Sequence, residues 1–271
     1  MNFKKLIATP IALGLTVGSF PVVNSPAYAN SAEVSVPKGV VRKAFNSALS
    51  STRVRLDNYG KKGGTTGHKN SSYILYPNGN KKSVSIPDYR FNVNSRRQLR
   101  YYVDAMNTSS VRTNANGKGF KTILNFESQG EEIKTKCIRK RFRKWKPCLL
   151  KMEKDAHLNN SKLSMSFIPV AYKGSISYKN PVVNFQTNII TNKNLCTKIK
   201  GFCKHIRGRV KNEFTRKVET SFKSGLNNPQ VKAKVAKSVK NSLRNHLGKR
   251  NNWRIVSIRS QGNNFILKLS K

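Results

Sequence analysis

The hydrophobic pattern opens with a helical segment. After Pro37, positions that favour burial recur at a spacing of three and four residues: Val41, Phe45, Ala48, Leu49, Thr52 and Leu56. This spacing predicts an amphipathic helix of about five turns with one buried stripe. The next segment, residues 60–70, is rich in Gly and Lys and shows no periodicity, so we expect a mobile loop between this helix and a sheet.

Between Ser71 and Ile190 the pattern changes to the period of two that is typical of strands. Apolar and polar residues alternate in several runs: Tyr73/Leu75, Val84/Ile86, Tyr89/Phe91/Val93, Leu99/Tyr101/Val103, Phe120/Leu124/Phe126, Leu163/Met165/Phe167 and Val183/Phe185/Thr187/Ile189. Because a parallel sheet would show continuous apolar runs, the alternation favours an antiparallel sheet that is buried on one face.

Helical periodicity returns toward the C-terminus. One stripe recurs every four residues, and Gly225 can end that helix: Ile206, Val210, Phe214, Val218 and Phe222. A second helix is predicted to begin at Pro229, after the N-cap Asn228, and to end before Gly248. Its thin apolar stripe favours packing on a core over lying on a membrane: Val231, Val235, Val239, Leu243 and Leu247. Strands at 253–258 and 265–269 flank a turn and predict a closing hairpin.

These elements together predict an α+β fold, in which an antiparallel sheet of alternating strands is packed by one N-terminal and two C-terminal amphipathic helices. The N-terminus predicts export: Lys4 and Lys5 precede the apolar run from Leu6 to Val23, and Ala27-Tyr28-Ala29 is typical of a cleavage site. We therefore expect a signal peptide at residues 1–29 and a single secreted or periplasmic domain at 30–271, with no later segment that could span a membrane.

Charge changes this picture most. The chain has 53 Lys and Arg against 11 Asp and Glu, a formal net charge of +42. Self-repulsion at this density is normally offset by a negative partner, so we expect a polyanionic surface: anionic lipid, lipopolysaccharide or wall polymer, with DNA or RNA as the alternative. In the alternative interpretation, the high positive charge serves only to keep the protein soluble.

Four cysteines in an exported chain predict two disulfides. The sequence does not fix their pairing, but the two local bridges, Cys137–Cys148 and Cys196–Cys203, are favoured because each closes a short basic loop. Their spacings do not match those of zinc sites, so neither a metal nor another cofactor is expected.

The loop 137–148 carries the most distinctive chemistry. Six cations are candidate phosphate-binding residues: Arg139, Lys140, Arg141, Arg143, Lys144 and Lys146. Phe142 and Trp145 lie among them and are candidate anchors at a lipid headgroup boundary, or stacking residues for bases or sugars. In the alternative interpretation, this is an exposed hairpin whose two aromatic residues fold back onto the sheet.

The second loop, 196–203, continues into further basic residues, of which Lys204 and Arg207 are candidate anion-binding residues near the start of a helix. A purely structural bridge is the alternative. The histidines and acids are scattered and no catalytic motif is present, so no catalytic residue is assigned and we expect a protein that is not an enzyme; a basic secreted nuclease is the best catalytic alternative.

The order of a long amphipathic helix, alternating strands, helix and further strands, from Val36 to Leu269, resembles the tubular lipid-binding superfamily typified by bactericidal/permeability-increasing protein. The disulfide-closed basic loop is similar to lipopolysaccharide-binding loops of antimicrobial factors. The resemblance implies a lipid-accommodating groove between helix and sheet, although two successive C-terminal helices and two local disulfides depart from the usual arrangement. We therefore expect an exported cationic protein that binds an anionic envelope lipid, glycolipid or polymer. The alternatives are extracellular nucleic-acid binding and an antimicrobial or toxic role.

Overall fold

The structure is a computed structural model that describes residues 30–61, 68–87, 89–127, 133–148, 156–191 and 200–271. Residues Ser31–Lys271 form one compact unit, and the predicted signal peptide lies outside the described residues. Within the described ranges, no helix combines the length and the apolar character that crossing a membrane requires.

The predicted α+β fold with antiparallel strands is confirmed. The larger sheet has eleven strands among the described residues, and every neighbouring pair is antiparallel. In sheet order they are β6 (Lys81–Ser83), β5 (Tyr73–Leu75), β2 (Arg53–Leu56), β9 (Met106–Asn116), β10 (Gly119–Phe126), β13 (Ala156–Tyr172), β11 (Ile133–Arg141), β8 (Arg97–Val103) and β7 (Tyr89–Asn94), with β12 (Lys144–Pro147) added on β11 and β14 (Ser175–Thr191) added on β13.

A smaller sheet joins the two ends of the compact unit. Its strand order is β1 (Ser31–Pro37), β16 (Asn264–Ser270) and β15 (Arg254–Gln261), and the predicted hairpin between β15 and β16 is confirmed. The sequence did not predict β1. Two short strands, β3 (Gly60–Lys61) and β4 (His68–Lys69), pair around residues 62–67, so most of the predicted mobile loop lies outside the described residues.

The first helix, α1 (Lys38–Leu49), is shorter than predicted. Thr52 and Leu56 are buried as expected, but Leu56 lies on β2, which pairs with β5 and β9. The alternation of Val54 and Leu56 with Arg53 and Arg55 was the signal for a strand, and tertiary pairing decided between two periodicities that both bury Leu56. Strand β5 also differs from the prediction. Its buried residue is Ile74, whereas Tyr73 and Leu75, the apolar positions taken from the sequence, are only half-buried.

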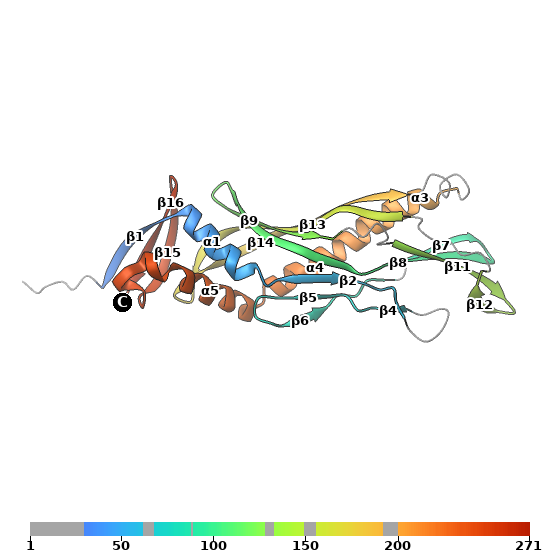
Figure 1. Cartoon of the computed structure of the whole chain (residues 1–271), viewed down its shortest axis with the longest axis horizontal. Coiled ribbons are helices and arrows are strands. Elements are labelled where there is room, and N and C mark those ends of the chain that lie inside the picture. The colour runs from blue at the N-terminus through green and yellow to red at the C-terminus, as the bar shows by residue number, and fades with distance from the viewer. Residues whose placement is uncertain (1–29, 62–67, 88, 128–132, 149–155, 192–199) are drawn as a thin grey trace, which may run out of the picture. The chain divides into compact units, whose positions relative to one another are not determined.

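The C-terminal helical region begins with α3 (Phe202–His205), η1 (Ile206–Phe214) and α4 (Thr215–Leu226), which follow one another without a break (Figure 1). The segment η1 is a π-helix. The four-residue repeat seen in the sequence is longer than the 3.6-residue period of an α-helix, and the wider π turn suits it. Ile206 and Phe214 on η1 are both buried, and so are Val218 and Phe222 on α4.

The last long helix, α5 (Pro229–Leu247), matches the prediction closely and is followed by the 3-10 turn η2 (Gly248–Arg250). Asn228 caps it, since its Oδ1 accepts a hydrogen bond of 2.8 Å from the Gln230 backbone N–H. All five predicted stripe residues are buried, and the core below them includes Phe45, whose ring lies 5.7 Å from Phe120 and 4.9 Å from Phe167 between centroids.

Candidate functional site

The basic loop predicted from the sequence is a β-hairpin closed by a disulfide. Strands β11 and β12 are antiparallel, and Cys137 is bonded to Cys148, which confirms that predicted bridge. The Cys148 backbone N–H also donates to the Cys137 carbonyl at 3.0 Å. The two turn residues are Phe142 and Arg143, with φ of 48° and 63°. Positive φ at both central residues is the pattern of a type I′ turn, which fits the twist of a two-residue hairpin.

The register of this hairpin sorts its cations by face. Arg139 pairs with Lys146, and Arg141 pairs with Lys144. Because side chains directly opposite each other share a face and residues two apart on a strand share it too, these four cations lie on the same face. Lys140 belongs to the other face of β11, and Arg143 lies in the turn.

A fifth cation joins this face from the neighbouring strand. Arg97, at the start of β8, pairs directly with Arg139. We call Arg97, Arg139, Arg141, Lys144 and Lys146 the cationic face. The sequence analysis missed Arg97 because its pairing with β11 joins residues 42 positions apart, although the dipeptide Arg96-Arg97 was visible as a charged pair.

The cationic face has no neutralising partner among the described residues: no carboxylate there forms an ion pair with it. The Arg139 Nε is buried and lacks a hydrogen-bond partner within the same part of the chain. Like charges directly opposite one another in a sheet are unfavourable, so this face is better suited to contact with an anion than to stabilising the hairpin.

The turn presents Phe142 to solvent with 96% of its surface exposed. This answers the question left open by the sequence for one of the two aromatic residues, because Phe142 does not fold back onto the sheet. For Trp145 the structure describes the backbone, which pairs with Lys140. Its assignment as an anchor remains a prediction.

The second basic loop lies mostly outside the described residues, Cys196 included, while Cys203 is disulfide-bonded. Lys204 is exposed on α3. Arg207 is exposed on η1, where its Nη2 donates to Thr191 Oγ1 on β14 at 3.0 Å. In the described part of the chain, no hydrogen bond or ion pair joins either residue to the cationic face, so the structure does not bring these two predicted sets together by direct contact.

The α3 helix packs onto the sheet that carries the hairpin, through Phe202 and His205. The His205 ring lies 5.1 Å from Phe91 and 6.1 Å from Tyr101 between centroids, and its Nε2 is buried without a partner among the described residues. Burial lowers the pKa of His205 below its ordinary value of 6.5, and the positive charge of Arg209 lowers it further. A hydrogen bond with the Arg90 backbone and the charge of Glu213 act in the opposite direction.

This environment predicts an acid-sensitive fold. In the unfolded chain His205 takes up a proton at a higher pH than in the folded protein. The contribution of neutral His205 to stability is therefore fully present above pH 6.5 and is lost as the pH drops toward the folded pKa. We expect the urea unfolding midpoint to decrease between pH 7.5 and pH 5.5, and to decrease less in His205→Leu. An equal decrease in both proteins would contradict this role.

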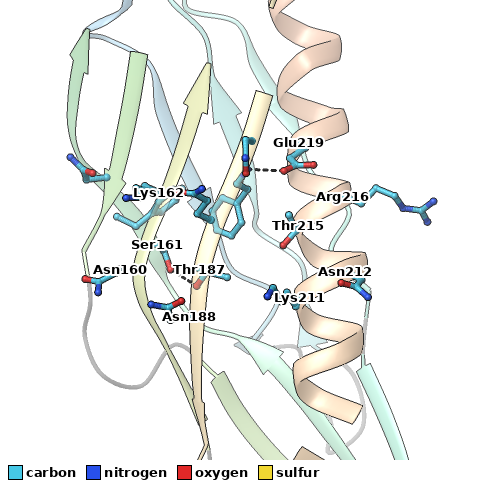
Figure 2. A pocket seen from close by; sticks show the side chains of 15 residues that line it. Asn160, Ser161, Lys162, Thr187, Asn188, Lys211, Asn212, Thr215, Arg216 and Glu219 are labelled. Atoms are coloured by element: carbon cyan, nitrogen blue, oxygen red, sulfur yellow. Dashed lines mark hydrogen bonds between the residues drawn. The ribbon is translucent and has the colours of Figure 1, made fainter. Parts of the chain in front are cut away.

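A large polar cavity of about 910 Å³ lies between the sheet and the η1–α4 helix (Figure 2). Its walls come from β10, β13, β14 and the helix: Asn125, Phe126, Asn160, Ser161, Lys162, Asn184, Phe185, Gln186, Thr187, Asn188, Lys211, Asn212, Thr215, Arg216 and Glu219. Two hydrogen bonds order it. Glu219 Oε1 accepts from the Phe185 backbone N–H at 2.7 Å, and the hydroxyls of Ser161 and Thr187 lie 2.7 Å apart.

The chemistry of this cavity differs from that of an acyl-chain site. A cavity does lie between helix and sheet, where the family resemblance implied a lipid groove, but amides, hydroxyls and charged groups dominate its lining. The two apolar residues, Phe126 and Phe185, are buried and pack edge to face at 5.7 Å between ring centroids. Enclosing a hydrocarbon chain here would leave many polar groups without partners. The sequence analysis did not identify the residues that line this cavity, because they come from strands and a helix that are distant in sequence.

Comparisons with known proteins give limited similarity. No protein-family model matches the chain, and neither does any curated protein. One similar solved structure is the crystal structure of a lipopolysaccharide binding protein, with a TM-score of 0.38 and 10% sequence identity over 82% of this chain and 50% of that one. The present chain therefore spans about half the length of that structure. The resemblance inferred from the sequence is supported only as a weak structural similarity, and it carries no conclusion about function.

Proposed function

We propose that this chain is an exported binding protein that attaches to an anionic envelope surface through its cationic hairpin. Phosphates of the surface contact the cationic face, and the side chain of Phe142 enters the boundary between headgroups and acyl chains. In this proposal the protein binds and performs no catalysis. Lys140 and Arg143 supply further contacts around the turn, and Trp145 acts as the second anchor.

The observation that carries the proposal is the exposed Phe142 at positive φ. A bulky aromatic residue is rare in the left-handed region, and type I′ turns favour Asn or Gly instead. Exposure of 96% means that Phe142 gains nothing from packing to offset this cost. Strained, exposed residues of this kind cluster at functional sites, and an aromatic side chain beside cations is the usual composition of a membrane-interface contact.

The disulfide supports the same function in two ways. It holds the two ends of the hairpin together, so that little conformational freedom remains to be lost on binding. It is also typical of proteins outside the cytosol, where envelope lipids and wall polymers are accessible.

The polar cavity limits how a lipid can be held. Because its lining is unsuited to hydrocarbon, we propose that the protein binds a surface from outside and does not extract single lipid molecules from it. An envelope glycolipid or polymer would then be recognised through its anionic groups.

The test is co-sedimentation of the oxidised protein with vesicles of phosphatidylglycerol and phosphatidylcholine at low and high salt, beside the variant Phe142→Asn. Asn is favoured in this turn, so the hairpin itself should be preserved or improved. Burying a Phe side chain contributes about 1.5–3 kcal/mol. We therefore expect salt-resistant binding by the wild type and binding that is weaker by roughly tenfold or more in the variant.

Two outcomes would contradict the proposal. Equal binding by both proteins at high salt would show that Phe142 does not enter the membrane. Complete loss of wild-type vesicle binding at high salt, with duplex DNA outcompeting the vesicles at low salt, would instead favour binding to nucleic-acid phosphates, which depends steeply on salt.

A further inference from the structure

We propose that the chain has a second anion-binding site, sized for a phosphate group or a short phosphate chain, where the β13–β14 turn meets α5 and β15. It uses none of the hairpin residues and is a binding site in its own right. The site is a hollow of about 340 Å³ with four cations on its walls: Lys173, Lys237, Lys240 and Arg254. We call it the four-cation hollow.

The cations come from three separate elements. Lys173 lies in the turn between β13 and β14, Lys237 and Lys240 lie one turn apart on α5, and Arg254 is the first residue of β15. In a chain of this charge, exposed Lys and Arg are expected on most surfaces. Convergence of four of them from distant segments around one hollow is a more specific arrangement.

Small residues keep the hollow open. The remaining lining residues are Gly174, Ser175, Ala233 and Ala236. Ala233 and Ala236 lie on the side of α5 that faces the turn, where larger side chains would fill the space. At Gly174, φ is +76° and a Cβ atom would lie 3.3 Å from Arg254 Cγ, so this position both needs glycine for its backbone and lets the arginine side chain lie against it.

Hydrogen bonds fix the three elements around the hollow. The Ile255 backbone N–H donates to the Gly174 carbonyl at 3.1 Å, which joins β15 to the turn. Ser175 Oγ donates to the Ala236 carbonyl at 2.6 Å, which joins the turn to α5. Lys240 Nζ donates to the Trp253 carbonyl at 3.1 Å, which joins α5 to the residue before β15. The site is therefore arranged before any ligand arrives, which favours affinity.

The charges of the hollow are not neutralised within the described part of the chain. No carboxylate lines it, and none of the four cations has an ion pair among the described residues. Lys237 and Lys240 repel each other at their spacing of three on the helix. An anion in the hollow would relieve this repulsion and receive charge-assisted hydrogen bonds.

The lining also indicates the class of ligand. It contains no aromatic residue, so it has no surface on which a base or a sugar ring could stack, and no carboxylate that would accept a hydrogen bond from a hydroxyl. Ammonium and guanidinium groups match the oxygens of a phosphate. The ligand is therefore a phosphate or pyrophosphate group, either free or carried on a lipid headgroup.

The test is calorimetric titration of the full protein with inorganic pyrophosphate, using the double variant Lys237→Gln/Arg254→Gln. The matched control is Lys223→Gln/Lys234→Gln, which removes the same charge from exposed helical positions outside the hollow. We expect pyrophosphate binding about tenfold weaker or worse in the hollow variant, since it loses charge-assisted hydrogen bonds to the phosphate oxygens, and little change in the control. Lys237→Gln alone should show a smaller loss.

A second measurement separates a binding role from a structural one. At low salt and without ligand, the thermal midpoint of the hollow variant should equal or exceed that of the wild type, because repulsion is reduced, whereas the upward shift produced by pyrophosphate should be lost. Equal pyrophosphate affinity in the hollow variant and the control would overturn the site.

Pyrophosphate binding at the four-cation hollow should not depend on the cationic hairpin. A variant that lacks the hairpin cations should keep the pyrophosphate site, and loss of pyrophosphate binding in that variant alone would overturn the present proposal while leaving the hairpin as the anion site.

Vesicles that carry phosphatidic acid distinguish a lipid phosphate from a soluble one. Binding that depends on Lys237 and Arg254 assigns the site to a lipid phosphate, and pyrophosphate binding without such vesicle binding assigns it to a soluble phosphate; either result supports the site.

Discussion

Replacing Arg139, Arg141, Lys144 and Lys146 together with Gln is expected to weaken binding to anionic vesicles by roughly a thousandfold. Each Lys or Arg near an anionic membrane surface contributes about 1 kcal/mol, so four contribute about 4 kcal/mol at low salt. The four residues share one face of the β11–β12 hairpin. They have no ion pairs among the described residues, so their charges are not neutralised by those carboxylates and can attract the membrane surface.

The matched control removes four exposed cations from elsewhere: Lys217, Lys223, Lys234 and Lys268. This variant has the same net charge, so it should lose only the part of the affinity that depends on total charge. Vesicle flotation at increasing lipid concentration measures both proteins, with the Cys137–Cys148 bond verified in each. If the two variants weaken equally, binding follows net charge and the hairpin has no special role.

The largest expected change in stability is at Gly225, near the end of α4. A methyl group there would overlap the ring and hydroxyl of Tyr76, which is buried and donates a hydrogen bond of 3.0 Å to the Ser221 carbonyl. Since Tyr76 also packs against Phe222 at 6.3 Å between ring centroids, it has little freedom to move. We expect Gly225→Ala to reduce the free energy of unfolding by about 1–3 kcal/mol.

Gly39 in α1 gives the opposite expectation and serves as the control. Nothing lies within 4 Å of a Cβ atom at this position. Ala is favoured over Gly in a helix by about 1 kcal/mol, so Gly39→Ala should be neutral or stabilising. The urea unfolding midpoint should decrease in Gly225→Ala and stay the same or increase in Gly39→Ala. A Gly225→Ala variant as stable as the wild type would show that Tyr76 does not pack against this glycine.

The parts of the fold that could be predicted are those in which local pattern and tertiary packing agree. The helix α5 has a cap, a proline at its first position and a regular stripe, and each of these signals lies within a single segment. The hairpin between Cys137 and Cys148 is equally local. For α5 the sequence predicted the element and its boundaries. For residues 137–148 it predicted the disulfide-closed basic loop but not the pairing of β11 with β12.

Elsewhere, long-range pairing decided the structure. Strand β9 is rich in Asn, Ser and Thr and has no clear alternation, yet it lies between β2 and β10 in the large sheet. The role of Arg97 depends on its pairing with Arg139, and the four-cation hollow brings together segments that are far apart in the sequence. No local pattern encodes these neighbours, so the candidate cations could be predicted from the sequence but their grouping into separate surfaces could not.

The pairing of β1 with β16 sets the order in which the protein can fold. Ser31 pairs with Ser270 and Pro37 with Asn264, so the first strand of the compact unit remains without its partner until residues 264–270 are available. Contacts of such high sequence separation form slowly and leave strand edges exposed in the meantime. Folding of the small sheet must therefore wait until residues 264–270 have been synthesised, and a chain interrupted before residue 264 would lack the strand that pairs with β1.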